Sequence, residues 1–216
     1  FMRALSERQY SRSSRTDINE AITEALTEWR SILEDVNARS LDVDAPAFID
    51  SVIYTDGSWP DHRKGETEGA RIGAVVLSRD FKVPLAFGCE VPAAVVNTWS
   101  DRASQIVVVE LIATVVAIHT FEPVVRDKKI VWLIDSESVL GGLIKGNSDR
   151  EDLGPLVTLF WKAVRDANIS VYLDRIPTDG NLSDKPSRSV WSVAAQAGWA
   201  VIPAVVPDSV RVGRPV

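Results

Sequence analysis

Four acidic residues are spaced along the chain so that folding could bring their carboxylates together: Asp56, Glu110, Asp135 and Asp184. Asp56 and Asp135 each follow an apolar run, in IYTDGSW and VWLIDS. Glu110 lies within a long apolar stretch, and Asp184 occurs in NLSDKPSR. Clustered carboxylates repel one another unless cations neutralise them. Two divalent metal ions about 4 Å apart would remove that repulsion and could promote hydrolysis of a phosphodiester.

Glu110 is the most informative of the four residues. Between Arg102 and Glu122 it is the only acidic or basic residue apart from His119. The valines at 107–109 favour a strand, but the length and the alanines of this stretch favour a buried helix. An ionised carboxylate buried among apolar side chains is costly unless it is paired. We therefore expect a cation beside Glu110; the alternative is that it lies on the solvent side of its helix.

Each of the three aspartates also has a purely structural interpretation. Asp56 with Gly57 is a common turn pair. Asp135 could be the N-cap of the segment that follows it, and Asp184 could cap a helix that begins near it. Taken singly, these interpretations compete with metal binding. The order of the four acids along the predicted elements favours a shared metal site.

The elements that must position these acids are predicted from hydrophobic patterns. Apolar and alternating runs predict five strands, at 49–56, 70–78, 83–90, 129–134 and 169–176. A turn at 56–58 is expected to end the first strand. Helical patterns predict helices at 101–120, 136–144, 153–167 and 187–198. This order predicts an α/β fold, a mixed five-stranded sheet with helices on both faces.

The sequence predicts three regions. Residues 1–48 read as an N-terminal helical extension and linker, with a capping box at Asp17 and Glu20 ahead of an apolar stripe that includes Trp29. Residues 49–200 form the predicted globular domain, and 201–216 a C-terminal tail. Because Phe1 precedes Met2, we expect the chain to be part of a longer protein.

Composition restricts the possible metal chemistry. The chain has 216 residues, 45% hydrophobic and 25% charged, which suits one domain with an appendage. Its single cysteine, Cys89, excludes an internal disulfide and a zinc site built on several thiolates. With two histidines, His62 and His119, a histidine-rich site is also excluded. A metal must therefore be held by oxygen, which favours magnesium, manganese or calcium.

Charge and hydropathy bear on partners and location. The net charge of −6 argues against tight, independent binding of nucleic acid. The apolar stretch at 106–118 is interrupted by Glu110 and Thr114, so no membrane partner is expected. The N-terminal residues lack the apolar segment of a signal peptide. We therefore expect an intracellular protein, in the cytoplasm or the nucleus.

Four motifs together resemble the ribonuclease H family: IYTDGSW, SQIVVVELIATVVAI, VWLIDSESVLGGLIKGNS and DRIPTDGNLSDKPSR. They follow the family's order and spacing across 49–198. They most resemble the ribonuclease H domain of retroelement reverse transcriptases. The tract LIKGNS followed by LVTLFWKAV, and the ending IPTDGNLSDKPSR, look like the branch found in tyrosine-recombinase-type retroelements. The resemblance implies a ribonuclease H-like fold. It also implies a metal-dependent endonuclease that hydrolyses the RNA strand of RNA–DNA hybrids, as part of a reverse transcriptase.

The resemblance also implies roles for the four acids. Asp56 would bridge two Mg²⁺ ions, for which Mn²⁺ could substitute. Glu110 and Asp135 would complete one ion's site, and Asp184 the other's. One ion would activate a water and the other would stabilise the leaving oxygen. The RNA strand would be distinguished by its 2′-hydroxyls.

The chain departs from the family pattern in two ways. Many members place a histidine in the loop before the last aspartate, but 177–183 contains none; Thr178 or Asp179 could occupy its place. A basic substrate-binding insertion is not evident, so another domain could supply the grip on the hybrid. The helix around Trp29 is similar to one that joins this domain to a polymerase in retroelement proteins. Its alternative is a helix packed on the domain's own sheet.

Two competing functions remain. A catalytically silent relative, used as a scaffold or interaction domain, would usually have lost one or more of the acids, and all four are present here. An integrase, transposase or exonuclease of the same fold would place its glutamate late in the chain, whereas Glu110 comes second among the four. The presence and order of the acids favour the hydrolase.

Overall fold

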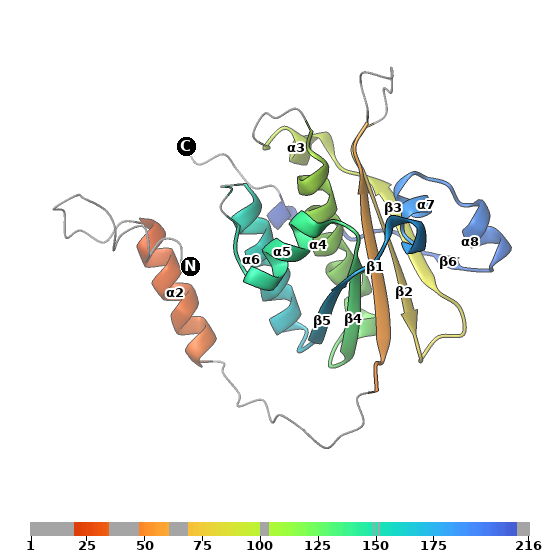
Figure 1. Ribbon diagram of the computed structural model, residues 1–216. Coiled ribbons are helices and arrows are strands. Elements are labelled where there is room, and N and C mark those ends of the chain that lie inside the picture. The colour runs from red at the N-terminus through yellow and green to blue at the C-terminus, as the bar shows by residue number, and fades with distance from the viewer. Residues whose placement is uncertain are drawn as a thin grey trace. The chain divides into compact units, whose positions relative to one another are not determined.

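The computed structural model describes residues 20–34, 48–60, 69–99, 104–148, 150 and 152–210. The chain divides into two compact units, Phe1–Pro46 and Ala47–Val216. In the first unit, helix α2 spans Glu20–Glu34 (Figure 1) and has Ile22 and Ala25 buried, while Leu26 and Leu33 are exposed. The predicted capping residue Asp17 lies outside the described residues.

The second unit is built on a mixed sheet, which in the described part of the chain has six strands in the order β5-β4-β1-β2-β3-β6 (Figure 1). The strands are β1 (Ser51–Ser58), β2 (Arg71–Ser78), β3 (Leu85–Glu90), β4 (Lys129–Ile134), β5 (Ser170–Arg175) and β6 (Ala200–Val201). β1 pairs antiparallel with β2 and parallel with β4, and β5 continues the parallel half. The prediction of a mixed sheet is confirmed, with β6 as an additional short strand.

Helices cover both faces of this sheet, as predicted (Figure 1). One face is covered by α4 (Ile106–Val125), α5 (Glu137–Lys145) and α6 (Leu153–Asp166), with α4 against β1 and β2 and α6 packed on α4. The other face contacts α7 (Asp184–Ser187), which is followed by α8 (Ser192–Gln196). Shorter elements are α3 (Ala93–Val96), η2 (Thr178–Gly180) and η3 (Asp208–Val210).

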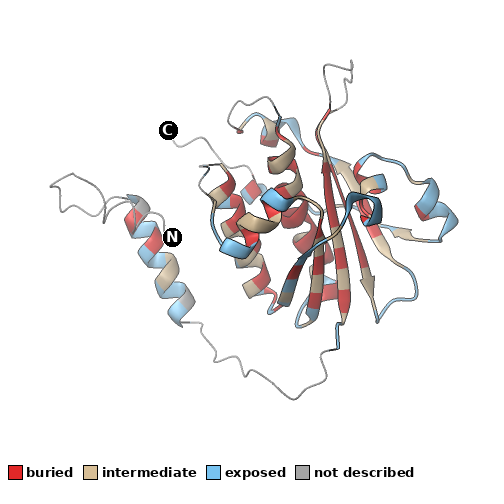
Figure 2. Cartoon of the chain, viewed as in Figure 1, coloured by how far each residue is buried: buried red, intermediate tan, exposed pale blue. Residues whose placement is uncertain are grey.

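Helix α4 forms the centre of the hydrophobic core. Most of its residues are buried, and Figure 2 shows the buried positions concentrated along α4 and the central strands. Among the described residues it is the one helix whose length and apolar composition would allow it to cross a membrane. Its burial against the sheet and α6 accounts for that composition, because a helix that is apolar all round is stable when it is enclosed.

Several predicted boundaries differ from the structure. The turn predicted at 56–58 is wrong, because β1 continues to Ser58 and these residues pair with β2. The helix predicted at 101–120 is α4, which begins at Ile106 and extends to Val125 with Pro123 in its last turn. Of the helix predicted at 187–198 only α8 and Ser187, the last residue of α7, are helical. Between them Ser189 adopts a left-handed backbone conformation, with φ of 58°, which ends a helix.

The globular unit extends beyond the predicted boundary at residue 200. Ala200 and Val201 pair with β3, the backbone N–H of Val205 donates to Thr120 Oγ1 at 2.9 Å, and Val210 is fully buried. Residues 201–210, expected as part of a tail, therefore pack against the unit. Residues 211–216 lie outside the described residues.

Candidate metal centre

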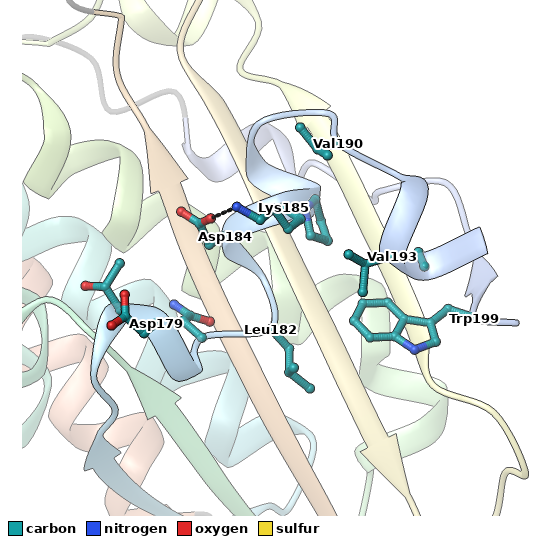
Figure 3. A pocket seen from close by; sticks show the side chains of 11 residues that line it. Asp179, Leu182, Asp184, Lys185, Val190, Val193 and Trp199 are labelled. Atoms are coloured by element: carbon teal, nitrogen blue, oxygen red, sulfur yellow. Dashed lines mark hydrogen bonds and ion pairs between the residues drawn. The ribbon is translucent and has the colours of Figure 1, made fainter. Parts of the chain in front are cut away.

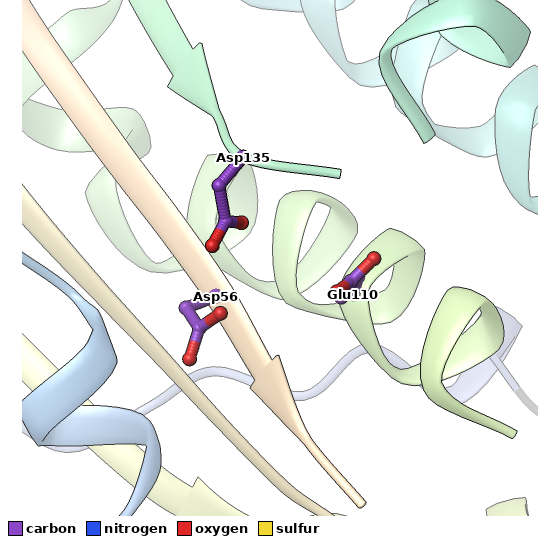
Figure 4. A group of neighbouring side chains, drawn as sticks. All are labelled: Asp56, Glu110 and Asp135. Atoms are coloured by element: carbon purple, nitrogen blue, oxygen red, sulfur yellow. The ribbon is translucent and has the colours of Figure 1, made fainter. Parts of the chain in front are cut away.

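Three of the four predicted acids converge at one place. Asp56, Glu110 and Asp135 each offer a carboxylate oxygen, and these oxygens all lie within 4.8 Å of one another. Figure 4 shows that the three side chains come from β1, from α4 and from the residue that follows β4. β1 and β4 are parallel neighbours in which Thr55 is opposite Ile134. An aspartate follows each of these two residues in the chain, so this register places Asp56 beside Asp135.

A glycine allows α4 to bring Glu110 to the two aspartates. Gly57 follows Asp56 and faces α4, and a Cβ atom added to it would lie 2.7 Å from the backbone nitrogen of Glu110 and 2.9 Å from the carbonyl carbon of Val109. Real Cβ atoms do not approach backbone so closely. Only glycine at position 57 therefore permits this contact between strand and helix.

Burial makes the ionised form of this cluster costly. Asp56 is 5% exposed. Burial raises the pKa of Asp56 from 3.8 to about 6; a hydrogen bond from Ser187 opposes that shift, and the charges of Asp135 and Asp184 add to it. Burial likewise raises the pKa of Glu110 from 4.5 to about 7, where the Ser136 hydroxyl opposes the shift and the charges of Asp135 and Asp56 add to it.

Two oxygens of the cluster lack partners in the described part of the chain. Glu110 Oε2 and Asp135 Oδ1 are buried and accept no hydrogen bond there. Buried carboxylate oxygens are normally satisfied by donors or by a cation. Three carboxylates with two unsatisfied oxygens are suited to a hard, oxygen-preferring cation such as Mg²⁺ or Mn²⁺.

Asp184 lies beside the cluster and is not grouped with it. It is the first residue of α7, and its side chain is 17% exposed. Arg188 Nε donates to Asp184 Oδ1 at 2.9 Å, and Lys185 Nζ donates to Oδ2 at 3.1 Å. Burial would raise the pKa of Asp184, but these two partners outweigh it and hold the pKa below its ordinary value. Its charge still raises the pKa of Asp56, so the two carboxylates interact.

The four acids do not occupy the turn, helix-cap or solvent-facing positions that their structural interpretations require. Asp56 pairs with Gly73 inside a continuous strand, so it is not a turn residue. The N-cap of α5 is Ser136, which follows Asp135, and the N-cap of α7 is Ser183. Glu110 is only partly exposed, and one of its oxygens is buried. None of the four has the simple capping or solvent-facing position that its alternative required.

Several residues around the cluster were not singled out from the sequence. Ser187 Oγ donates to Asp56 Oδ2, Asn181 Nδ2 donates to Thr55 O at 3.1 Å, and Ser58 Oγ donates to Ser187 O at 3.0 Å. Asn181 and Ser187 both occur in the motif that contains Asp184. Their partners are more than a hundred positions away in the chain, so only the fold identifies these contacts.

A pocket adjoins Asp184 on the α7 side (Figure 3). Its polar wall includes Thr178, Asp179 and Asn181, and its apolar wall includes Val193 and Trp199. Thr178 and Asp179, the two candidates for the place of the missing histidine, are exposed. Asp184, one of the four predicted metal ligands, lines the pocket. Asp56, Glu110 and Asp135 do not line it.

No protein-family model matches the chain, and no curated protein matches it. Several solved structures are similar to it. The N-terminal RNase H domain of a Mycobacterium tuberculosis protein, solved as a fusion with maltose binding protein, is 18% identical, with a TM-score of 0.48 over 70% of this chain and 99% of that one. An RNase H1 isolated from compost, solved in complex with RNA/DNA hybrid, is 16% identical, with a TM-score of 0.48 over 67% and 99%.

A third similar structure is a larger protein. Prototype foamy virus protease-reverse transcriptase is 14% identical, with a TM-score of 0.37 over 92% of this chain and 30% of that one. The predicted α/β fold is confirmed: the sheet is mixed, β1 lies between an antiparallel and a parallel neighbour, and helices cover both faces. This fold brings together Asp56, Glu110 and Asp135.

Proposed function

We propose that the chain is a metal-dependent endonuclease that hydrolyses the RNA strand of RNA–DNA hybrids. The observation that supports this most directly is the convergence of Asp56, Glu110 and Asp135, with two buried oxygens that have no partner among the described residues. Such a group is unfavourable when it is ionised and empty. A bound Mg²⁺, or Mn²⁺ in its place, would remove that cost.

A second ion would require Asp184. We propose that Asp56 and Asp184 hold it together, once Asp184 exchanges its contacts with Lys185 and Arg188. The two ions would supply an activated water and a stabilised leaving oxygen. Lys185 and Arg188 are 54% and 56% exposed, so both can turn toward solvent. There they are suited to bind phosphate groups of a substrate and to orient its backbone.

The choice of substrate follows from the family resemblance. The RNA strand would be recognised through its 2′-hydroxyls. With a net charge of −6, the chain is expected to need a further domain for a firm grip on the hybrid. We propose that this is the polymerase part of a reverse transcriptase, joined through 1–48, within one intracellular polyprotein.

A catalytically silent scaffold is the second candidate. Two observations favour it: Asp184 is engaged by two basic side chains, and the loop at 177–183 contains no histidine. Such a protein would retain the fold and could retain metal binding. It would not cleave a hybrid under any metal condition.

Cleavage of labelled RNA–DNA hybrid, duplex DNA and duplex RNA distinguishes these functions. Each substrate is incubated with the wild type in Mg²⁺, Mn²⁺ or EDTA, and in parallel with Asp135→Asn and with Asp174→Asn. Asp174 is an exposed aspartate on the neighbouring strand β5 and serves as the matched control. We expect metal-dependent cleavage of hybrid RNA alone, lost in Asp135→Asn and kept in Asp174→Asn.

Two outcomes would refute the proposed hydrolase: cleavage that persists in Asp135→Asn, or cleavage of duplex DNA in place of the hybrid. A wild-type chain that binds Mn²⁺ and cleaves none of the three substrates, even with the polymerase domain restored, would establish the silent alternative.

A further inference from the structure

Ser187 joins α7 to β1 at the position of Asp56. It is the last residue of α7, and none of its surface is exposed. Its hydroxyl donates to Asp56 Oδ2, and its carbonyl oxygen accepts a hydrogen bond from Ser58 Oγ at 3.0 Å. These two bonds connect a four-residue helix with two residues of the central strand, one of them a predicted metal ligand.

The sheet is shaped to receive this helix. In the sheet register Asp56 lies opposite Gly73, which lies opposite Gly88. A Cβ atom on Gly73 would lie 2.3 Å from Ser187 N, and one on Gly88 would lie 2.3 Å from Pro186 O. These two glycines, opposite each other on neighbouring strands, therefore let the backbone of α7 lie against the sheet. Only at this separation can a side chain as short as serine reach the Asp56 carboxylate.

The Ser187 hydroxyl has one proton and two acceptors within reach. One is the Asp56 carboxylate and the other is the carbonyl oxygen of Asp184, at 2.9 Å. A carboxylate is the stronger acceptor, since the hydrogen bond is then charge-assisted. The bond to Asp56 restricts rotation of its carboxyl group, which a free aspartate side chain would retain.

We propose that Ser187 is a positioning residue for the metal centre. Its hydroxyl holds the Asp56 carboxylate in the orientation that lets it bind a divalent cation together with Glu110 and Asp135. Ser187 itself is not a ligand. The inference rests on the proposed function, and it assigns a second task to α7, which carries Asp184 at its first residue and Ser187 at its last.

A calorimetric titration of Mn²⁺ into the full chain, which measures the Kd, tests this role. Ser187→Ala removes the donor with little change in packing. Loss of a hydrogen bond that orients a metal ligand reduces affinity about tenfold or more. We therefore expect the Kd for Mn²⁺ to rise about tenfold. In a cleavage assay the Mg²⁺ concentration for half-maximal rate should rise by a similar factor, with the maximal rate recovered at saturating Mg²⁺.

Ser183→Ala is the matched control. Ser183 precedes α7, is equally buried, and its hydroxyl donates to Asn181 Oδ1 at 2.5 Å. Its loss should lower the free energy of unfolding about as much as Ser187→Ala does, and should leave the Kd for Mn²⁺ within about twofold. If Ser187→Ala fails to fold, Ser187→Cys retains a weak donor and is expected to have a Kd between those of the wild type and the alanine variant.

An unchanged Kd in Ser187→Ala, or an equal rise in Ser183→Ala, would overturn the positioning role and leave the proposed function intact. A wild-type chain that binds no Mn²⁺ would instead overturn the proposed metal centre, and this inference with it. The two failures are therefore distinguishable.

Discussion

At the scale of single residues, protonation and metal binding compete at the carboxylates of Asp56 and Glu110. Burial raises their pKa values to about 6 and about 7 in the metal-free protein. Metal ligands of this type must be deprotonated. Protons therefore occupy the cluster near pH 6 and below, and are released well above pH 7.

The affinity for divalent metal should consequently depend on pH. We expect the Kd for Mn²⁺ to be lowest near pH 8 and to rise at least about tenfold by pH 5.5, because each pH unit below a pKa reduces the ionised fraction about tenfold. Calorimetric titrations at pH 5.5, 6.5 and 8 would measure this change. A Kd that is constant across this range would contradict the raised pKa values.

The same pKa shift predicts the stability of a Glu110→Gln variant without metal. The folded chain retains the Glu110 proton up to about pH 7, whereas the unfolded chain loses it near pH 4.5. Stability of the wild type is therefore lost as pH rises through this window. We expect Glu110→Gln to be more stable than the wild type by about 3 kcal/mol at pH 8 and nearly equal at pH 4. Urea denaturation in EDTA at both pH values measures this, and equal differences at the two would refute it.

The sequence was most informative where a residue conflicts with its surroundings. Glu110 could be singled out because a lone carboxylate in an apolar helix needs compensation, and most residues of α4 are indeed buried. Ser187 could not be recognised, because a serine near the end of a short polar motif fits any surface helix. Its significance depends on Asp56, which is 131 positions away in the chain.

At the scale of elements, glycines determine how closely helices approach the sheet. Gly57 accommodates α4, while Gly73 and Gly88 accommodate α7. Each contact involves backbone atoms, which cannot move aside as a flexible side chain could. The arrangement of the carboxylates therefore depends on residues that have no side chains.

Gly73→Ala tests this dependence. Its Cβ would lie 2.3 Å from Ser187 N and 2.8 Å from Ser187 Cα, so α7 must move away from the sheet. We expect the free energy of unfolding to fall by about 3 kcal/mol, as in overpacked cores, and Mn²⁺ binding to weaken. Gly141→Ala in α5 is the control, since nothing lies within 4 Å of its added Cβ. It should stabilise the chain by about 0.5–1 kcal/mol through helix propensity. Denaturant titration would measure both, and equal effects would contradict the expectation.

Element types were easier to predict than element ends. Apolar runs identified the first five strands because each contributes apolar side chains to the core, which in β5 are Leu173 and the partly buried Val171. The Asp-Gly pair at 56–57 suggested a turn, but β1 continues there because β2 supplies a paired strand. β6 has two residues, too few for any period to appear, and its pairing with β3 depends on the chain returning to that edge.

At the scale of the whole molecule, the two compact units should differ in their importance for stability. Unit Ala47–Val216 contains the sheet, the core and all four acids. We expect a chain of residues 47–216 to unfold cooperatively, with a Tm within about 3 °C of the full chain, which is about the shift that 1 kcal/mol causes in a chain of this size.

Removing the C-terminal segment as well should have a different effect. A chain of residues 47–199 lacks β6, the bond from Val205 to Thr120 and the buried Val210. We expect its Tm to fall by about 5–10 °C relative to 47–216. Scanning calorimetry measures the Tm of both chains. A large fall in Tm on removing 1–46, with no fall on removing 200–216, would contradict this expectation.

Above all, we expect Asp56, Glu110 and Asp135 to bind a divalent cation together. Anomalous diffraction from crystals grown with Mn²⁺ tests this most directly, because it locates the ion without reference to activity. We expect a manganese peak in contact with oxygens of all three carboxylates, at about 2–2.5 Å, that disappears in Asp135→Asn. Manganese bound only elsewhere, or carboxylates that remain together with no ion between them at saturating Mn²⁺, would contradict the claim.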